Sequence, residues 1–164
     1  MATDTQGFAH PRSRRRSLTA LLAGALAVVA FAPTVLADGA TVTRGDFAPF
    51  VANTELQITG RAQMNRTADG KTIVSVHVEG LLAGTTYGAH VHAAACGNGF
   101  ADGHYKYDPD GPAAPPNEIW PGFTTNDAGV GNGNATVDWT AGSTAVSVVV
   151  HAPGLTKIAC ADLV

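Results

Sequence analysis

Short runs of strand-forming residues, each bounded by glycine, aspartate, asparagine or proline, recur through the chain from residue 38 to its end. No long apolar repeat with the period of a helix accompanies them. Short strands at regular spacing are typical of β-sandwiches and flattened barrels, and we therefore predict an all-β fold. The predicted strands are Glu55–Met64, Thr72–Glu79, Thr86–Ala93, Asn134–Trp139, Ala145–His151 and Ile158–Leu163, and the segment 38–52 offers at most an edge strand.

The clearest turn signal is the segment Thr67–Lys71, which separates the first two of these runs. Its Asp-Gly pair supplies the backbone freedom that a tight hairpin needs. In the strand that follows, valines alternate with Ser75, His77 and Glu79. Because side chains alternate between the two faces of a strand, the valines are expected to face the core and His77 the solvent.

Residues 1–37 have the composition of an export signal. A basic stretch ending at Arg16 precedes an apolar run from Leu18 to Ala32, and the small residues at Val35–Ala37 suit peptidase cleavage. The apolar run is short for a bilayer span, which needs about 20 residues. We therefore expect a signal peptide, no stable membrane anchor, and a secreted or periplasmic/cell-envelope location for one domain over residues 38–164. The arginine cluster fits either general or twin-arginine export.

Beyond this leader the chain is acidic. It carries six basic and twelve acidic residues, a formal net charge of −6. Proteins that bind nucleic acid need a basic surface to neutralise phosphates, so nucleic acid is not expected as a partner. The remaining length suits one hydrophobic core rather than two.

The chain has two cysteines, Cys96 and Cys160. In an exported protein two cysteines most simply form one disulfide, and the alternative is a pair of free thiols or metal ligands. A bridge over so long a stretch of chain would contribute about 4 kcal/mol on the loop-entropy model.

Four histidines form a candidate metal site. His90 and His92 flank Val91 in a predicted strand, so both imidazoles lie on one face while Val91 points to the other. His104 lies in a segment between residues 94 and 120 that shows no periodicity, and a long irregular segment in a compact domain is usually functional. His151 ends an apolar run. Four imidazoles without a thiolate suit copper or zinc, and composition alone does not choose between them.

The segments around these histidines and cysteines follow one another in the order Gly80–His92, Cys96, Gly103–Tyr105, Val148–His151 and Ile158–Cys160. In content and order they resemble the copper/zinc superoxide dismutase family, and the similarity covers nearly all of the chain from Leu56 onward. The resemblance implies a Greek-key β-sandwich of the immunoglobulin-like superoxide dismutase type. It also implies a disulfide between the two cysteines and a copper ion held by His90, His92, His104 and His151.

The zinc site of that family has no counterpart in this sequence. The family uses two further histidines and an aspartate after the metal-bridging histidine, whereas no histidine occurs between Tyr105 and Thr125. The two histidines left over are His10, in the leader, and His77, on a predicted strand. Carboxylates without imidazole or thiolate do not make a typical structural zinc site, so we predict that zinc is absent. This pattern resembles the copper-only branch of the family.

Two further residues stand at functional positions of the family. The copper-only branch is thought to use a glutamate in place of zinc, and Glu118 is the candidate here, accepting the far N–H of His104. The long charged loop before the second cysteine is reduced to residues 152–159, which predicts a metal site open to solvent. Lys157 occupies the position of the active-site arginine and offers positive charge without the planar fork of donors.

The resemblance implies that the protein converts superoxide to oxygen and hydrogen peroxide, with His104, Lys157 and Glu118 as catalytic groups. Because the chain is acidic, attraction of the superoxide anion would depend on local positive charge at Lys157 and, more weakly, at Lys106. One alternative is a non-catalytic copper-binding protein that buffers or delivers the metal. Another is a zinc hydrolase that uses three of the histidines with Glu118 as general base. The sequence does not indicate an oligomeric state.

Overall fold

A computed structural model describes residues 39–50 and 56–164 of the chain. The expected signal peptide at residues 1–37 lies outside the described residues. Every regular element within them is a β-strand. Among the described residues no helix is long and apolar enough to cross a membrane.

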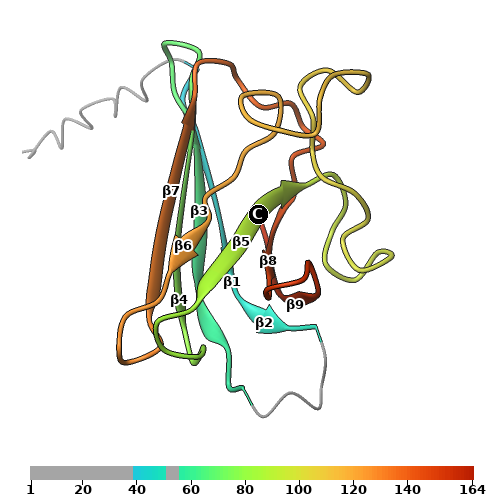
Figure 1. The fold of residues 1–164 in the computed structure, drawn as a ribbon. Coiled ribbons are helices and arrows are strands. Elements are labelled where there is room, and N and C mark those ends of the chain that lie inside the picture. The colour runs from blue at the N-terminus through green and yellow to red at the C-terminus, as the bar shows by residue number, and fades with distance from the viewer. Residues whose placement is uncertain (1–38, 51–55) are drawn as a thin grey trace, which may run out of the picture. The chain divides into compact units, whose positions relative to one another are not determined.

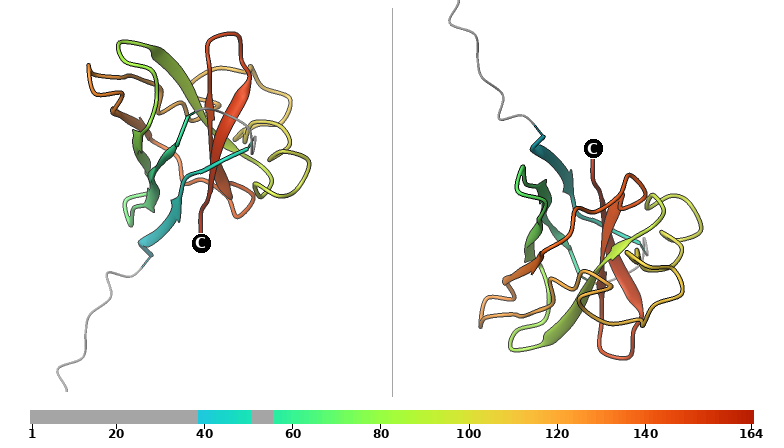
Figure 2. Two further views of the ribbon diagram at one scale, coloured as in Figure 1. Left: turned by 90° about the horizontal axis from the view of Figure 1, so that it is seen from below. Right: turned by 90° about the horizontal axis from the view of Figure 1, so that it is seen from above.

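The strands form two antiparallel sheets that face each other (Figures 1 and 2). One sheet has the order β1-β3-β4-β7 and the other the order β2-β9-β8-β5-β6. The prediction of an all-β sandwich is confirmed, and the described strands do not close into a barrel. The strands are β1 Thr41–Asp46, β2 Ala48–Pro49, β3 Thr59–Arg66, β4 Thr72–Glu79, β5 Thr86–His92, β6 Phe123–Thr124, β7 Gly131–Val137, β8 Ser147–His151 and β9 Lys157–Asp162.

The ambiguous N-terminal segment supplies both β1 and β2, and each lies at the edge of its sheet. Several details differ from the sequence-based expectation. β3 begins at Thr59 rather than at residue 55, β7 begins at Gly131 rather than at residue 134, and the short strand β6 was not expected. β6 consists of two residues paired with the start of β5, which is too short to produce an alternating pattern in the sequence.

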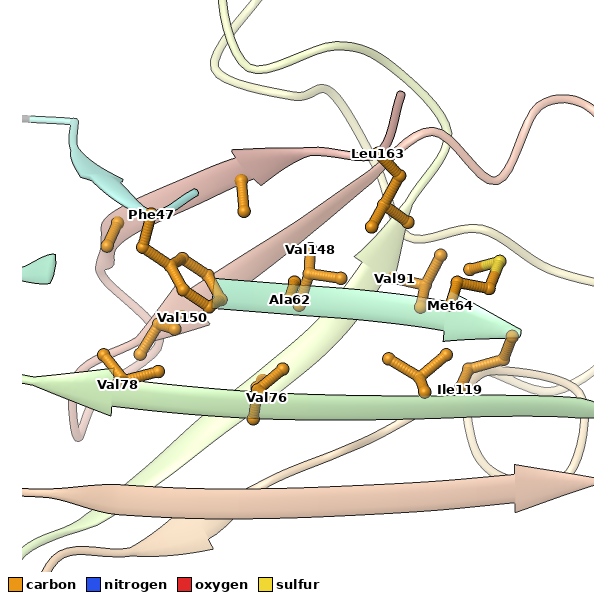
Figure 3. Packing of buried hydrophobic residues seen from close by; sticks show 14 of the residues in the cluster. Phe47, Ala62, Met64, Val76, Val78, Val91, Ile119, Val148, Val150 and Leu163 are labelled. Atoms are coloured by element: carbon orange, nitrogen blue, oxygen red, sulfur yellow. The ribbon is translucent and has the colours of Figure 1, made fainter. Parts of the chain in front are cut away.

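The hydrophobic core lies between the two sheets (Figure 3). In β4 the alternation is as predicted, because Val74, Val76 and Val78 are buried whereas His77 is exposed. Val91 of β5 is also fully buried in this core. Since neighbouring side chains on a strand point in opposite directions, the flanking histidines project from the outer face of the five-stranded sheet.

The segment from residue 93 to residue 122 covers that outer face, as both views in Figure 2 show. Backbone hydrogen bonds attach it to β5: Tyr105 N–H donates to Val91 O, and Val91 N–H donates to Ile119 O. Buried Asn117 holds the turns between Tyr105 and Ile119. Its Nδ2 donates to Asp108 O at 2.9 Å, and its Oδ1 accepts from Asp108 N–H at 2.8 Å. The segment is therefore ordered by specific contacts although it contains no regular repeat.

A disulfide joins Cys96, at the start of this segment, to Cys160 in β9, with 5.8 Å between the two Cα atoms. The disulfide predicted from the sequence is confirmed. The backbone N–H of Cys96 also donates to Oδ1 of Asp162 at 2.7 Å. Both contacts anchor the covering segment to the last strand of the sheet.

Candidate metal centre

The four histidines predicted as ligands converge on the outer face of the five-stranded sheet. His90 and His92 extend from β5 and His151 from the adjacent strand β8, while His104 reaches them from the covering segment through an isolated bridge to His92. Each imidazole offers one nitrogen atom, either Nδ1 or Nε2, and these four nitrogens all lie within 4.8 Å of one another. His90, His92 and His151 are buried, whereas His104 is partly exposed.

In three of the imidazoles, one nitrogen is hydrogen-bonded to an oxygen atom outside the cluster. Nδ1 of His92 lies 3.1 Å from Ala101 O, and Nδ1 of His151 lies 3.2 Å from Leu155 O. Nδ1 of His104 lies 2.6 Å from Oε2 of Glu118. A carbonyl oxygen only accepts, so Nδ1 of His92 and of His151 donates and leaves its Nε2 as a lone-pair donor toward the cluster.

The fourth histidine is different, because Nδ1 of His90 is buried and has no hydrogen-bond partner. Leaving a buried polar atom unpaired is costly, and such atoms in native proteins call for an explanation. Nε2 atoms of His92 and His151 also approach each other to 3.4 Å. Nitrogen lone pairs gathered in this way fit a metal ion that accepts imidazole ligands, such as copper or zinc.

The electrostatics of the cluster favour neutral imidazoles. Burial, followed by the neighbouring histidines, lowers the pKa of His90 to about 3. Burial also lowers the pKa of His92 to about 4 and lowers that of His151. Histidine binds a metal in its neutral form, so these three side chains are ready to bind at neutral pH without first losing a proton.

Glu118 lies beside the cluster and its side chain is only 2% exposed. Its Oε2 accepts from Nδ1 of His104 and also from Nε1 of Trp120, at 2.8 Å. The backbone of Glu118 is held as well, since its N–H donates to Ala114 O. The residue that the sequence singled out is therefore in direct contact with His104.

Lys157 lies near the cluster, but its ammonium group is held by the protein backbone. Nζ donates to Phe100 O at 2.7 Å and to Asp102 O at 2.5 Å. These carbonyls belong to a turn in which Phe100, Ala101 and Asp102 all have positive φ, a conformation that costs free energy in residues with a side chain. The same turn provides the carbonyl acceptors of His92, so Lys157 supports one wall of the site.

The charge of Lys157 still reaches the site, because it contributes to lowering the pKa of His92 and His151. Lys106 is placed differently: its Nζ donates to Gly111 O at 2.9 Å. It lines a cavity of about 380 Å³ with Ala93, His104, Tyr105, Pro109 and Thr144.

Two further observations concern possible metal ligands among the described residues. Among the described residues, His77 is the one histidine outside the cluster. It lies in β4 of the other sheet and contacts Asn132 and Glu79. A second group, Cys96, Cys160 and Asp162, brings possible ligand atoms together, but its two sulfurs are joined to each other in the disulfide.

Trp120 is the residue of this site that sequence reasoning missed. Its ring centroid lies 5.0 Å from that of His90, and its indole N–H reaches Glu118. No local pattern distinguishes a tryptophan in an irregular segment, and proximity to Glu118 in the sequence was the one available signal.

The fold and site together define a β-sandwich protein with a buried four-histidine group that could hold a metal ion. No family model matches the chain, and no curated protein matches its sequence.

Proposed function

We propose that this protein is a copper-dependent superoxide dismutase that acts outside the cytoplasm, resembling the zinc-less branch of the copper/zinc superoxide dismutase family. The observation that carries the proposal is the convergence of His90, His92, His104 and His151 with the Nδ1 of His104 bonded to a carboxylate. These four residues come from the segments on which the resemblance rests. The carboxylate of Glu118 stands at the nitrogen that a zinc ion would bind in zinc-bearing relatives.

The donor atoms follow from the hydrogen bonds of the cluster. His92, His104 and His151 would bind the metal through Nε2, because their Nδ1 atoms contact Ala101, Glu118 and Leu155. His90 would bind through Nδ1, its buried unpaired atom. When bound, copper supplies one-electron chemistry that takes an electron from one superoxide anion and gives an electron to a second, which leaves as hydrogen peroxide after taking up two protons.

Glu118 would hold His104 in one tautomer and one orientation. A buried carboxylate accepts the Nδ1 proton of His104 in a hydrogen bond and so directs the Nε2 lone pair of that imidazole toward the cluster. The side chain of His104 is 29% exposed, so it is the member of the four-histidine group that solvent reaches most readily. Protons for the peroxide would therefore enter from water on the His104 side of the site.

Lys157 would favour the approach of an anionic substrate. The chain beyond the leader has a net negative charge, which repels superoxide at long range. Lys157 lies close enough to His92 and His151 to lower their pKa, so its positive charge is felt at the site. The ammonium is fixed by two carbonyls, and the steering charge therefore has a defined position.

Metal analysis combined with an activity assay tests the proposal. The purified protein is analysed for copper and zinc, loaded with each metal in turn, and assayed for superoxide removal by pulse radiolysis. We expect about one copper per chain and turnover with copper only. Copper binding without turnover would support a buffering or delivery protein instead, and hydrolytic activity with zinc would support the hydrolase alternative.

A further inference from the structure

The carboxylate of Glu118 receives two N–H donors at a single oxygen. Nδ1 of His104 lies 2.6 Å from Oε2, and Nε1 of Trp120 lies 2.8 Å from the same atom. An indole nitrogen carries a hydrogen and only donates, so the direction of the second bond is unambiguous. Trp120 is thus hydrogen-bonded to the group that orients His104.

The second donor matters because the carboxylate is buried. A charged group away from water is costly unless hydrogen bonds replace its hydration, and bonds to an ionised acceptor are among the stronger ones. Without the indole N–H, Glu118 would keep His104 as its donor at Oε2 but would lose its second donor at that oxygen. The direction of the His104 ring would then be less tightly defined.

Trp120 also contacts a second histidine of the cluster. Its ring lies 5.0 Å from the ring of His90 at an interplanar angle of 49°. His90 carries the buried Nδ1 that has no hydrogen-bond partner and is 7% exposed. The indole therefore packs against one candidate ligand with its ring and acts on another through Glu118.

The backbone on both sides holds Trp120 in this place. Ile119 is fully buried in the hydrophobic core (Figure 3). Its carbonyl accepts from Val91 N–H in β5. Pro121, on the other side, is also buried. A tryptophan with 39% of its surface exposed is therefore anchored by its neighbours rather than left free on a loop.

We propose that Trp120 is a positioning residue of the metal centre, which fixes Glu118 on His104 through its N–H and packs against His90 with its ring. The inference rests on the proposed function for the identity of the metal. It assigns to Trp120 an influence on copper affinity and on the geometry of the bound ion.

Trp120→Phe separates the two contacts, because phenylalanine keeps an aromatic ring beside His90 but has no N–H for Glu118. Trp139→Phe is the matched control: Trp139 is more exposed, at 49%, and its ring packs on Tyr107 outside the cluster. Copper affinity is measured by competition with a chelator, and the Cu(II) site by electron paramagnetic resonance.

We expect Trp120→Phe to weaken copper binding about 10-fold, as is typical when a partner of a metal-bound histidine is disturbed, and to change the Cu(II) spectrum. Trp139→Phe should match the parent protein in both measurements. A Trp120→Phe protein with parental affinity and spectrum would overturn the inference. Neither measurement depends on superoxide turnover, so a copper-binding protein without turnover would refute the proposed function while leaving this test intact.

Fluorescence provides a second measurement on folded protein, which stays valid if Trp120→Phe fails to fold. The chain has two tryptophans, so Trp139→Phe leaves Trp120 as the sole indole emitter. Cu(II) is expected to quench the emission of Trp139→Phe strongly, because the indole adjoins the site, whereas equimolar Zn(II) should quench it little. Emission from Trp120 that does not respond to Cu(II) under conditions where copper binds would place the indole away from the metal and contradict the inference.

Discussion

Oε2 of Glu118 lies 2.6 Å from Nδ1 of His104, so a buried carboxylate contacts the most exposed member of the histidine cluster. We predict that Glu118→Ala weakens copper binding by about 10-fold to 100-fold, because the carboxylate sets the tautomer and direction of His104. Glu118→Gln should fall between the parent and Glu118→Ala, since an amide oxygen still accepts but carries no charge. A chelator competition titration measures both.

Glu79→Gln controls for the loss of an acidic side chain, because Glu79 is exposed on the opposite sheet and contacts His77. It should bind copper like the parent protein. Equal affinity in Glu118→Ala and Glu79→Gln would refute a role for Glu118 at the metal centre.

Lys157 combines a charge with two hydrogen bonds to the turn at Phe100–Asp102. We predict that Lys157→Met slows superoxide removal at low ionic strength by about 10-fold and flattens its dependence on salt, because the positive charge that attracts the anion is lost. It should also weaken copper binding, because the carbonyl acceptors of His92 lose their support. Pulse radiolysis over a range of salt concentrations measures the first effect.

Lys157→Arg keeps the charge and can donate to the carbonyls, so it should preserve the salt dependence. Lys71→Met removes a lysine that pairs with Asp69 and Asp138, and should leave both the rate and its salt dependence unchanged. An unaltered salt profile in Lys157→Met would count against steering by this residue.

The parts of this structure that follow a local rule were predictable. The valine alternation in β4 and the common face of His90 and His92 both depend on the two-residue period of a strand, which the sequence displays directly. The two-residue strands β2 and β6 are too short to show any period. Their positions follow from pairing with distant strands.

The convergence of the site depends on long-range contacts that spacing does not encode. His151 meets the β5 histidines because β8 pairs with β5. In the sequence, the strand period places only His90 and His92 on one face, and the convergence of all four histidines was supported by the family resemblance. The positive φ angles of Phe100 and Ala101 carry no glycine or asparagine signal. The sequence indicated a positive charge at Lys157 but not its hydrogen bonds, whereas in the structure the ammonium donates to two carbonyls of that turn.

The disulfide links metal binding to stability, because Cys96 anchors the segment that supplies the acceptors of His92. We predict that the Cys96→Ser/Cys160→Ser protein is less stable by about 4 kcal/mol on the loop-entropy model and binds copper more weakly. Urea unfolding and chelator competition measure the two effects. Treatment of the parent protein with a reductant should reproduce both, and full copper affinity in the double variant would separate the disulfide from the site.

The lowered pKa values of the cluster predict how the metal-free protein responds to acid. In the unfolded chain histidine has a pKa of about 6.5, whereas burial holds the pKa of His90 at about 3 and that of His92 at about 4. As pH falls below about 6.5, the unfolded chain takes up protons that the folded protein does not, so the free energy of unfolding decreases until the folded pKa values are reached. Each of these two histidines lowers the free energy of unfolding by about 2 kcal/mol between pH 7.5 and pH 5, so we expect a loss of about 4 kcal/mol from the pair.

His77 contributes with the opposite sign, since hydrogen bonds to Asn132 and then Glu79 raise its pKa in the folded state. Its stabilisation is present below the unfolded pKa of about 6.5 and is lost as pH rises through the folded value. His77→Gln should therefore make the loss of stability toward pH 5 steeper. Bound copper should raise the free energy of unfolding at both pH values but should not reduce that loss, because histidines that bind a metal take up no protons. Urea unfolding at pH 7.5 and pH 5 provides the measurement, and a metal-free protein equally stable at both would show that the buried histidines titrate normally.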